Sequence, residues 1–283
     1  MNKMFFLLAL GCTFLACNTP QETIPLRIAT YNLRMDTPAD SLNAWSYRKE
    51  NVKALIRHHH FDIVGTQEGF RHQLDNLAEL PEYTAIGAGR DDGLSAGEHS
   101  AILYRTDKFL VVDSGNFWLS ETPDVPGKGW DATCCNRICS WVKFCHRESG
   151  AEFYVFNVHF DHQGVVARRE SGKLMIRKIQ EIAGQAPVIC TGDFNSHPGT
   201  EQIQTLSAFL HDARTVTATS PYGPEGTFNG RFTNPVHPER IDYIFLSNHF
   251  QVDSYAVLTD NNGLYYPSDH LPVAADVHLI PQR

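Results

Sequence analysis

The sequence has no apolar run of the roughly 18 residues that a membrane-spanning helix needs and no stretch rich in lysine and arginine. Its 283 residues carry 24 basic and 32 acidic side chains, a formal net charge of −8. Because sequence-independent binding of long nucleic acids depends on basic patches that displace counterions, this composition disfavours stable binding of that kind. With 42% apolar and 20% charged residues, the composition is that of a folded protein rather than a disordered one.

The start of the chain predicts a targeting segment followed by a polar tether. Lys3 precedes a short apolar run that ends in a small residue before Cys17, a pattern typical of a secretory signal. The junction resembles a lipoprotein cleavage site at which Cys17 receives the lipid; ordinary signal-peptidase cleavage is the alternative. We therefore expect a signal peptide over residues 1–17, a polar tether over 18–24 and one domain over 25–283, since neither a linker nor a repeat divides that region. The protein is then expected to be exported, as a periplasmic or outer-membrane-anchored lipoprotein that touches the membrane only through its lipid, and to be a monomer.

Cysteine is scarce beyond the signal segment. Five cysteines remain there: Cys134, Cys135, Cys139, Cys145 and Cys190. None of their spacings repeats the C-x-x-C pattern of a zinc site, and an odd number leaves at least one thiol free within one chain. Buried free cysteine is the simplest interpretation. A Cys135–Cys139 or a Cys134–Cys145 disulfide is the alternative in an oxidising compartment.

Strand-like runs alternate with a few helical patterns. Apolar stripes predict helices over 47–59 and 168–183, the second ending at Gly184. Runs rich in β-branched and aromatic residues predict strands over 26–33, 61–66, 101–104, 138–144, 153–160, 188–192, 241–246 and 271–279. Several of these runs are apolar on both faces, as strands between other layers must be. Sheets covered by helices predict an α/β layered domain.

Acidic, amide and imidazole groups stand where the predicted strands end or begin. Strand ends carry Asn32, Glu68, Asn157, His159, Asp193 and Asn195, and strand starts carry Asp242, Asp269 and His270. If the last two strands run antiparallel to the others, these starts and ends meet at one sheet edge. Carboxylate and amide oxygens form the hard ligand set that Mg²⁺ or Mn²⁺ prefers. Such a metal beside imidazoles suits attack of water on a phosphoester.

The sequence resembles the endonuclease/exonuclease/phosphatase superfamily in six motifs that come in the expected order. They are Tyr31-Asn32, Gln67-Glu68, Asn157-Val158-His159, Gly192-Asp193-Phe194-Asn195, Ile241-Asp242-Tyr243 and Ser268-Asp269-His270. Together they span nearly the whole expected domain. The resemblance implies a DNase I-like four-layer α/β sandwich, in which two mixed β-sheets pack face to face, helices flank them and a metal lies at the edge where the sheets open.

The resemblance also implies which residues bind the metal and which residues activate water. Glu68 would be the principal metal ligand, with Asn32 helping it and Asp269 on the metal side. Asp193 would position or deprotonate the attacking water, and Asn195 would orient that water and the phosphate. The implied metal is Mg²⁺ or Mn²⁺.

Two histidines would complete the catalytic set. His270 would contact a phosphate oxygen, while Asp242 would hold its ring by a hydrogen bond, as in other His–Asp pairs. His159 would donate to another phosphate oxygen. Because a carboxylate beside an imidazole favours the charged form, we expect a raised pKa for His270.

Four further residues are candidate substrate ligands, each with a structural alternative. Asn157 shares a strand face with His159, and Asp161 follows that strand at the expected rim of the cleft. Arg137 precedes a predicted strand, where it would bind a phosphate or else form a surface ion pair. His99 also precedes a strand and is expected to face the cleft.

The sequence thus predicts a Mg²⁺- or Mn²⁺-dependent phosphoester hydrolase, a phosphodiesterase or phosphatase, acting on a small or headgroup-type phosphoester. The resemblance does not fix the substrate, because members of the superfamily cut DNA, RNA, inositol phosphates and phospholipid headgroups. Two alternatives remain open. One is a secreted nuclease acting on DNA or RNA, and the other is a non-catalytic ligand-binding lipoprotein with the same fold.

Overall fold

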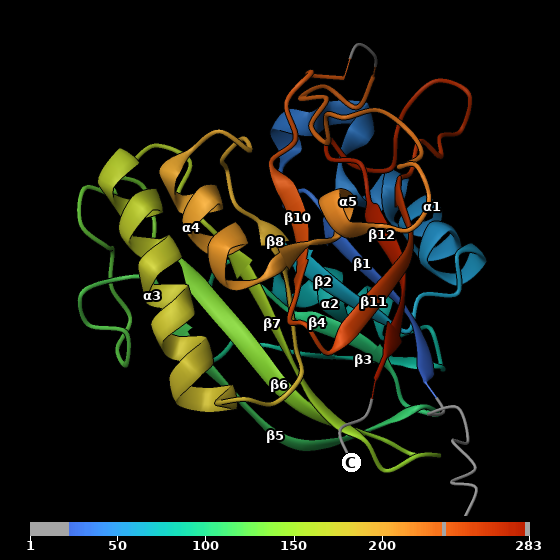
Figure 1. Cartoon of the computed structure of the whole chain (residues 1–283). Coiled ribbons are helices and arrows are strands. Elements are labelled where there is room, and N and C mark those ends of the chain that lie inside the picture. Colours follow the sequence, from blue (N-terminus) through green and yellow to red (C-terminus); the bar gives the residue numbers. More distant parts are fainter. Residues whose placement is uncertain (1–22, 234–235, 281–283) are drawn as a thin grey trace, which may run out of the picture.

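The computed structural model of the chain describes residues 23–233 and 236–280 (Figure 1). The expected signal segment, Cys17 and residues 18–22 of the tether lie outside the described residues. The strands are β1 (Ile24–Asn32), β2 (Ile63–Gln67), β3 (Tyr83–Ile86), β4 (Ile102–Arg105), β5 (Phe109–Trp118), β6 (Ile138–His146), β7 (Glu152–His159), β8 (Val188–Asp193), β9 (His211–Asp212), β10 (Asp242–Leu246), β11 (Phe250–Val257) and β12 (Val273–Leu279). The helices are the 3₁₀ helix η1 (Pro38–Asn43), α1 (Trp45–His58), α2 (Arg71–Leu77), α3 (Val165–Ala183), α4 (Glu201–Phe209) and α5 (Ala213–Val216).

The strands form two six-stranded mixed sheets. The first has the order β11-β12-β1-β2-β4-β3, and the second has the order β5-β6-β7-β8-β10-β9. In each sheet the central pair is parallel, β1 with β2 and β7 with β8, whereas the other pairs are antiparallel. The predicted pair of mixed sheets is confirmed.

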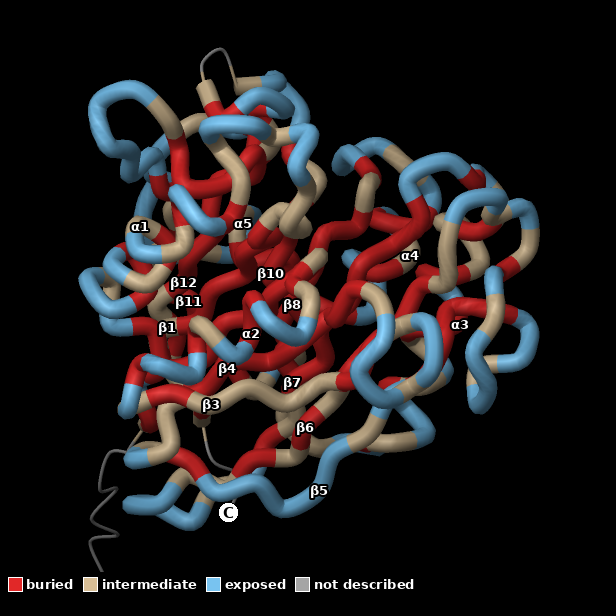
Figure 2. Tube along the Cα trace, turned by 180° about the vertical axis from the view of Figure 1, so that it is seen from behind, coloured by how far each residue is buried: buried red, intermediate tan, exposed pale blue. Residues whose placement is uncertain are grey.

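The two sheets pack face to face, with helices on both outer faces. Between the sheets lies an apolar cluster that includes Ile28 and Ile63 of the first sheet and Phe144 and Val155 of the second. The outer face of the first sheet packs against α1 and α2, and that of the second against α3 and α4. Figure 1 shows α3 and α4 on one side of the sandwich and α1 on the other. The predicted four-layer sandwich is therefore confirmed, and Figure 2 shows its buried strands enclosed by exposed loops.

The two predicted helices form close to their expected bounds, because each has a continuous apolar stripe. Residues Val52, Leu55 and Ile56 of α1 are buried against the first sheet. Helix α3 ends before Gly184, which adopts a positive φ of 59° as its cap. Within residues 23–233 and 236–280, no helix combines the length and the apolar character needed to cross a bilayer.

Strand direction brings the functional strand ends together. Strand β12 runs antiparallel to β1, and β10 runs antiparallel to β8, so that Asp242 lies opposite Asp193. Strand β7 runs parallel to β8 and places His159 opposite Asp193 as well. The strand starts and strand ends therefore meet at one edge of the sandwich, as the sequence predicted.

The cysteine pairing differs from both pairings considered from the sequence. Cys134 forms a disulfide with its neighbour Cys135, while Cys139, Cys145 and Cys190 are free. Cys139 and Cys145 belong to strand β6, and neither forms a disulfide. The expectation of buried free thiols is confirmed for Cys139 and Cys190.

Candidate active site

A cluster of carboxylates lies where β1, β2 and β8 end. The Asn32 amide Nδ2 donates to Glu68 Oε1 and to Asp193 Oδ2, both at 3.0 Å. Asn32 Oδ1 accepts the backbone N–H of Arg34. Asn32 therefore joins two acids from different sheets through its NH₂ group, and its oxygen faces away from them. These bonds position the two acids, and metal binding by Asn32, which the resemblance implies, stays a prediction.

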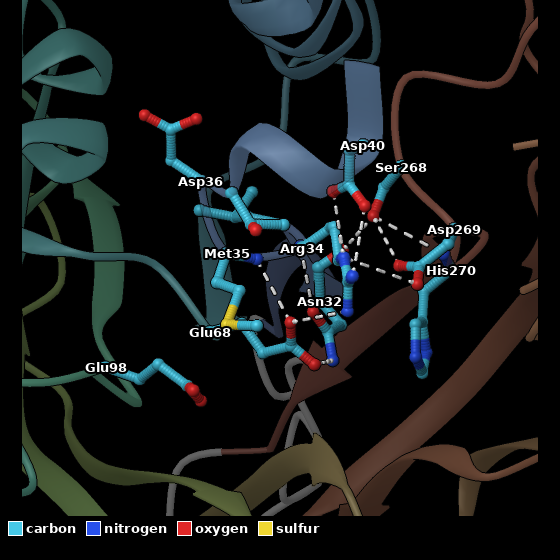
Figure 3. A network of polar contacts seen from close by, with 12 residues as sticks. Asn32, Arg34, Met35, Asp36, Asp40, Glu68, Glu98, Ser268, Asp269 and His270 are labelled. Atoms are coloured by element: carbon cyan, nitrogen blue, oxygen red, sulfur yellow. Dashed lines mark hydrogen bonds and ion pairs between the residues drawn. The ribbon is translucent and has the colours of Figure 1, made fainter. Parts of the chain in front are cut away.

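Glu68 and Asp269 form the side of this cluster that Figure 3 shows. Glu68 stands directly after β2 with a positive φ of 63°, and its Oε2 accepts the backbone N–H of Met35 at 3.0 Å. The guanidinium of Arg34 lies 4.0 Å from Glu68 Oε2 and 3.8 Å from Asp269 Oδ2, and it hydrogen-bonds Asp40. Burial raises the pKa of Glu68, but the charge of His270 and the Met35 N–H outweigh this and lower it. Glu68 is therefore held as a carboxylate.

His270 forms a charged pair with Asp242. Its Nδ1 lies 2.9 Å from Asp242 Oδ2, which also accepts a hydrogen bond from the Thr227 hydroxyl. Burial lowers the pKa of His270, but Asp242 and Asp193 outweigh it, so that the pKa rises well above the usual value. The predicted direction is confirmed, and His270 is an imidazolium. Asp193, Asp242 and His270 form a buried acid–histidine group whose ligand atoms lie within 4.8 Å of one another.

Asp193 contacts four other residues of the site. Besides Asn32, its carboxylate accepts the backbone N–H of Asn195 at 2.9 Å and lies 3.5 Å from His159 Nε2 and 3.7 Å from His270 Nε2. Burial and the charge of Asp242 raise the pKa of Asp193 to about 7. A carboxyl with this pKa is suited to exchange a proton near neutral pH. Asn195, at a φ of 46°, donates its amide to the Phe160 carbonyl.

His159 extends the site toward a second charged pair. Its Nδ1 lies 4.0 Å from Glu98 Oε2, and Glu98 also accepts a 2.6 Å hydrogen bond from Arg90. Burial, together with the charges of Arg137 and Arg90, lowers the pKa of His159 well below its usual value. His159 is therefore neutral where His270 is charged. Burial raises the pKa of Glu98 to about 7 even though Arg90 opposes it.

Two of the four candidate substrate ligands are buried beneath the site or beside it. The side chain of Asn157 is fully buried and hydrogen-bonds Gln67 Nε2, the carbonyls of Thr66 and Ala101, and the Thr191 hydroxyl. This corrects the substrate-binding prediction for Asn157, since its amide is satisfied inside the protein. His99 is buried too, with Nδ1 against the Gly69 carbonyl. It lies outside the main cavity, which corrects its expected orientation.

Asp161 supports its surroundings, whereas Arg137 faces the cavity. Asp161 is buried, and its Oδ2 accepts the backbone N–H groups of Gln163 and Gly164. Its Oδ1 lies 3.5 Å from Arg137 Nε. Asp161 therefore holds neighbouring groups in position, which corrects the prediction that it contacts the substrate directly. Arg137 lines the cavity, so phosphate binding by this residue stays a prediction.

The site opens into a cavity of about 480 Å³. Its wall combines the acids and histidines above with three arginines and a disulfide. The lining residues are Arg34, Met35, Glu68, Arg90, Glu98, Cys134, Cys135, Arg137, His159, His162, Asp193, Asn195, Phe228, Ile241, Asp269 and His270. A smaller cavity of about 320 Å³ lies away from this chemistry, between α1 and residues 260–267. Its lining includes a single acid, Asp260, and a single histidine, His58, so we place function at the larger one.

Sequence reasoning missed several residues of this cavity. Arg34, Arg90 and the Cys134–Cys135 pair come from loops, where no strand or helix pattern fixes the position of a side chain. One signal was available for Arg34, because it stands two residues after Asn32. Glu98 lies in the same loop as Arg90, and only the folded loop brings the two together.

Comparison with known proteins agrees with this geometry. The sequence model of the Endonuclease/Exonuclease/phosphatase family matches residues 29–270. A solved structure of a protein of this family from Bacteroides thetaiotaomicron is 44% identical, with a TM-score of 0.87 over 91% of this chain and 99% of that chain. A mannosyl-6-phosphatase from the same organism is 44% identical, with a TM-score of 0.84 over 89% of this chain and 99% of that chain. An uncharacterised protein of Acanthamoeba polyphaga mimivirus is 23% identical over 85% of this chain, which spans 42% of that protein.

The chain thus has a four-layer sandwich with buried acids, amides and histidines at the open edge of its sheets, the fold that it shares with these solved structures of the hydrolase family. The chain belongs to the Endonuclease/Exonuclease/phosphatase family.

Proposed function

We propose that the protein is a metal-dependent phosphomonoesterase that releases phosphate from a phosphorylated sugar. The observation that carries this proposal is the cavity of about 480 Å³, whose lining includes the proposed catalytic acids and histidines. A pocket of this size receives a small molecule. The mannosyl-6-phosphatase that is 44% identical to this chain supports the choice of a sugar phosphate.

The charges that line the cavity favour a monoester. Arg34, Arg90 and Arg137 line it together with the imidazolium of His270. A phosphomonoester carries nearly two negative charges at neutral pH, whereas a diester carries one. These local cations offer a dianion more partners than a monoanion needs, while Glu68, Glu98, Asp193 and Asp269 line the same cavity.

The residues present fit a divalent cation. Glu68 and Asp269 offer hard carboxylate oxygens, and the positive charge of Arg34 lies within 4.0 Å of both acids. This pocket thus already attracts a cation. Glu68 and Asp269 would hold Mg²⁺ or Mn²⁺, with Asp193 close by, whereas Asn32 orients the acids. When bound, the cation neutralises phosphoryl charge and lowers the pKa of a bound water.

The protein's own groups then divide the remaining work. Asp193 accepts a proton from the attacking water, because its pKa of about 7 keeps it half ionised at neutral pH. Asn195 stands beside it and orients that water. His270, fixed by Asp242, donates a charged hydrogen bond to a phosphoryl oxygen. His159 donates a neutral one from the other side of Asp193.

Phosphate release from a panel of substrates tests this proposal. The panel contains mannose 6-phosphate, glucose 6-phosphate, bis-p-nitrophenyl phosphate and single-stranded DNA, each assayed with Mg²⁺, Mn²⁺ or EDTA. We expect metal-dependent turnover of the sugar phosphates, lost in Glu68→Gln and kept in Glu181→Gln, an exposed match on α3. Preferred cleavage of bis-p-nitrophenyl phosphate would replace this proposal with a phosphodiesterase, and preferred cleavage of DNA would replace it with the nuclease alternative.

A further inference from the structure

We propose that the Cys134–Cys135 disulfide and the Arg137 guanidinium form a binding site for the leaving group of the substrate, a hexose ring. This inference rests on the proposed function. It assigns a role to the part of the cavity wall that the chemistry at phosphorus does not use.

The disulfide lies in the long connection between β5 and β6. Cys134 is exposed, Cys135 is half-buried, and both line the cavity that contains the catalytic residues. Once bonded to each other, the two sulfurs are neither nucleophiles nor metal-binding thiolates. They present a compact, polarizable and mostly apolar surface to the cavity.

The segment that carries the disulfide is anchored at several points. The Asp131 carboxylate accepts the backbone N–H groups of Val166 and Ala167 at the start of α3, at 3.0 and 2.7 Å. The Thr133 hydroxyl donates to Gln163 Oε1 at 2.6 Å. On the other side of the disulfide, the Asn136 amide donates to the Arg90 carbonyl. The wall is therefore held in place before a ligand arrives, which lowers the entropic cost of binding.

Arg137 supplies the polar half of this wall. Its side chain is only 5% exposed, and its Nε and Nη1 atoms make no hydrogen bond to another described residue. Its Nη2 lies 2.7 Å from His162 Nδ1, and an ion pair with Asp161 holds the group. Nε faces Asp161 Oδ1 at 3.5 Å, so Nη1 is the buried donor group that calls for an oxygen atom of a ligand.

The wall begins next to the reaction centre. His159 lies between the two regions, since its Nε2 is 3.5 Å from Asp193 and its Nδ1 is 4.0 Å from Glu98. Glu98 and Arg90 continue the lining with an acceptor and a donor. An alcohol esterified to a phosphate beside Asp193 therefore extends along this wall. A hexose fits it, because the ring has apolar C–H faces for the disulfide and hydroxyl groups for Arg137 and Glu98.

Calorimetric binding of two phosphonates tests the inference separately from turnover. One is the non-hydrolysable phosphonate analogue of mannose 6-phosphate, and the other is methylphosphonate, which has no ring. The variants are Cys134→Ala/Cys135→Ala and the control Cys145→Ala, which removes a half-buried cysteine outside the cavity. Wild-type protein reduced with a phosphine, its free thiols counted by alkylation and mass spectrometry, covers the case in which the double variant does not fold.

We expect the wild type to bind the sugar phosphonate more tightly than methylphosphonate. Loss of the disulfide, by substitution or by reduction, should weaken the binding of the sugar phosphonate about tenfold more than the binding of methylphosphonate. Cys145→Ala should keep the wild-type ratio. Equal weakening of both ligands, an unchanged ratio, or no preference for the sugar phosphonate in the wild type would overturn the inference. Failure of the proposed function shows instead as an absence of phosphate release from sugar phosphates, a result that leaves these binding constants readable.

Discussion

At the scale of single residues, the site rests on acids whose environments differ. Asp193 receives hydrogen bonds from Asn32 and Asn195, yet burial and Asp242 raise its pKa to about 7. Glu68 stays ionised because His270 and a backbone N–H favour its charged form. One carboxylate is thereby suited to move a proton and the other to hold a cation. This division follows from position alone, since both are ordinary carboxylic acids.

The first prediction concerns the proton acceptor. Asp193→Asn keeps the shape of the side chain but cannot accept a proton, and it retains only one of the two oxygens that accept hydrogen bonds from Asn32 and Asn195. We expect kcat for a sugar phosphate to fall at least about 100-fold, with KM changed little. Steady-state phosphate release measures both constants. Asp124→Asn, an exposed match, should behave as wild type. Activity above a tenth of the wild-type value in Asp193→Asn would argue against Asp193 as the base.

The second prediction concerns Arg34, whose charge lies 4.0 Å from Glu68 and 3.8 Å from Asp269. A cation so close to the acids opposes the binding of a second one. Arg34→Gln should therefore tighten Mn²⁺ binding about fivefold, in proportion to the Coulomb repulsion that it removes. Calorimetry without substrate measures the change. Arg71→Gln, which removes an exposed ion pair on α2, is the control. Unchanged or weaker binding in Arg34→Gln would show that its charge does not compete.

At the scale of elements, a buried hydrogen-bonded pair, Gln67 and Asn157, joins the two sheets beneath the catalytic residues. Gln67, at the end of β2, donates to Asn157 of β7 at 2.7 Å, and Asn157 donates in turn to the carbonyls of Thr66 and Ala101. Gly65 makes room for it, because a Cβ there would lie 2.0 Å from Thr191 Oγ1 and 2.5 Å from Asn157 Oδ1. The Gln67–Asn157 pair therefore fixes how the sheet edge that carries Glu68 faces the edge that carries Asp193.

The third prediction tests the packing of the two sheets around the Gln67–Asn157 pair. Gly65→Ala should lower the free energy of unfolding by about 2 kcal/mol, since the new methyl group must displace buried polar atoms on rigid strands. Urea denaturation followed by circular dichroism gives the value. Gly127→Ala offers a control, because its Cβ would meet no atom closer than 3.9 Å. Equal stability of the two variants would mean that the sheets separate easily at this point.

The elements that the sequence predicted share a clear burial pattern, whereas two of those it missed, β5 and α4, do not. Strands β1, β2, β7 and β8 are buried along most of their length, and α1 and α3 have apolar stripes. Strand β5 escaped prediction because it lies at a sheet edge, where Leu110, Val111 and Val112 face solvent and no alternation marks the strand. Helix α4 buries little more than Gln202, Ile203 and Leu206, too few residues for a clear stripe.

The same reasoning separates the predicted from the missed parts of the site. Asp193, Asp242 and His270 could be predicted because strand direction decides where they meet. The loop residues Arg34 and Arg90 could not, since a loop's path depends on packing that local sequence does not encode. The role of Asn157 was misjudged because alternation assigns a face but does not say whether that face meets a cavity or the opposite sheet.

At the scale of the whole molecule, the two sheets open at one edge, and the groups that act on phosphate come from both of them. Glu68 and Asn32 belong to the first sheet or follow it, Asp193 and Asp242 belong to the second, and Asp269 and His270 precede β12. The arginines that line the cavity suit a small anionic substrate, although the chain as a whole has a net charge of −8. In the proposed reaction, a proton acceptor, cation ligands and charged donors surround one phosphoryl group.

In the proposed reaction, water activated at Asp193 attacks phosphorus. Hydrolysis of mannose 6-phosphate in ¹⁸O-labelled water with Mg²⁺ tests it most directly, with both products analysed by mass spectrometry. The account predicts one labelled oxygen in the inorganic phosphate and none in the mannose. Label in the mannose would place the attack at carbon, and that result would contradict the account.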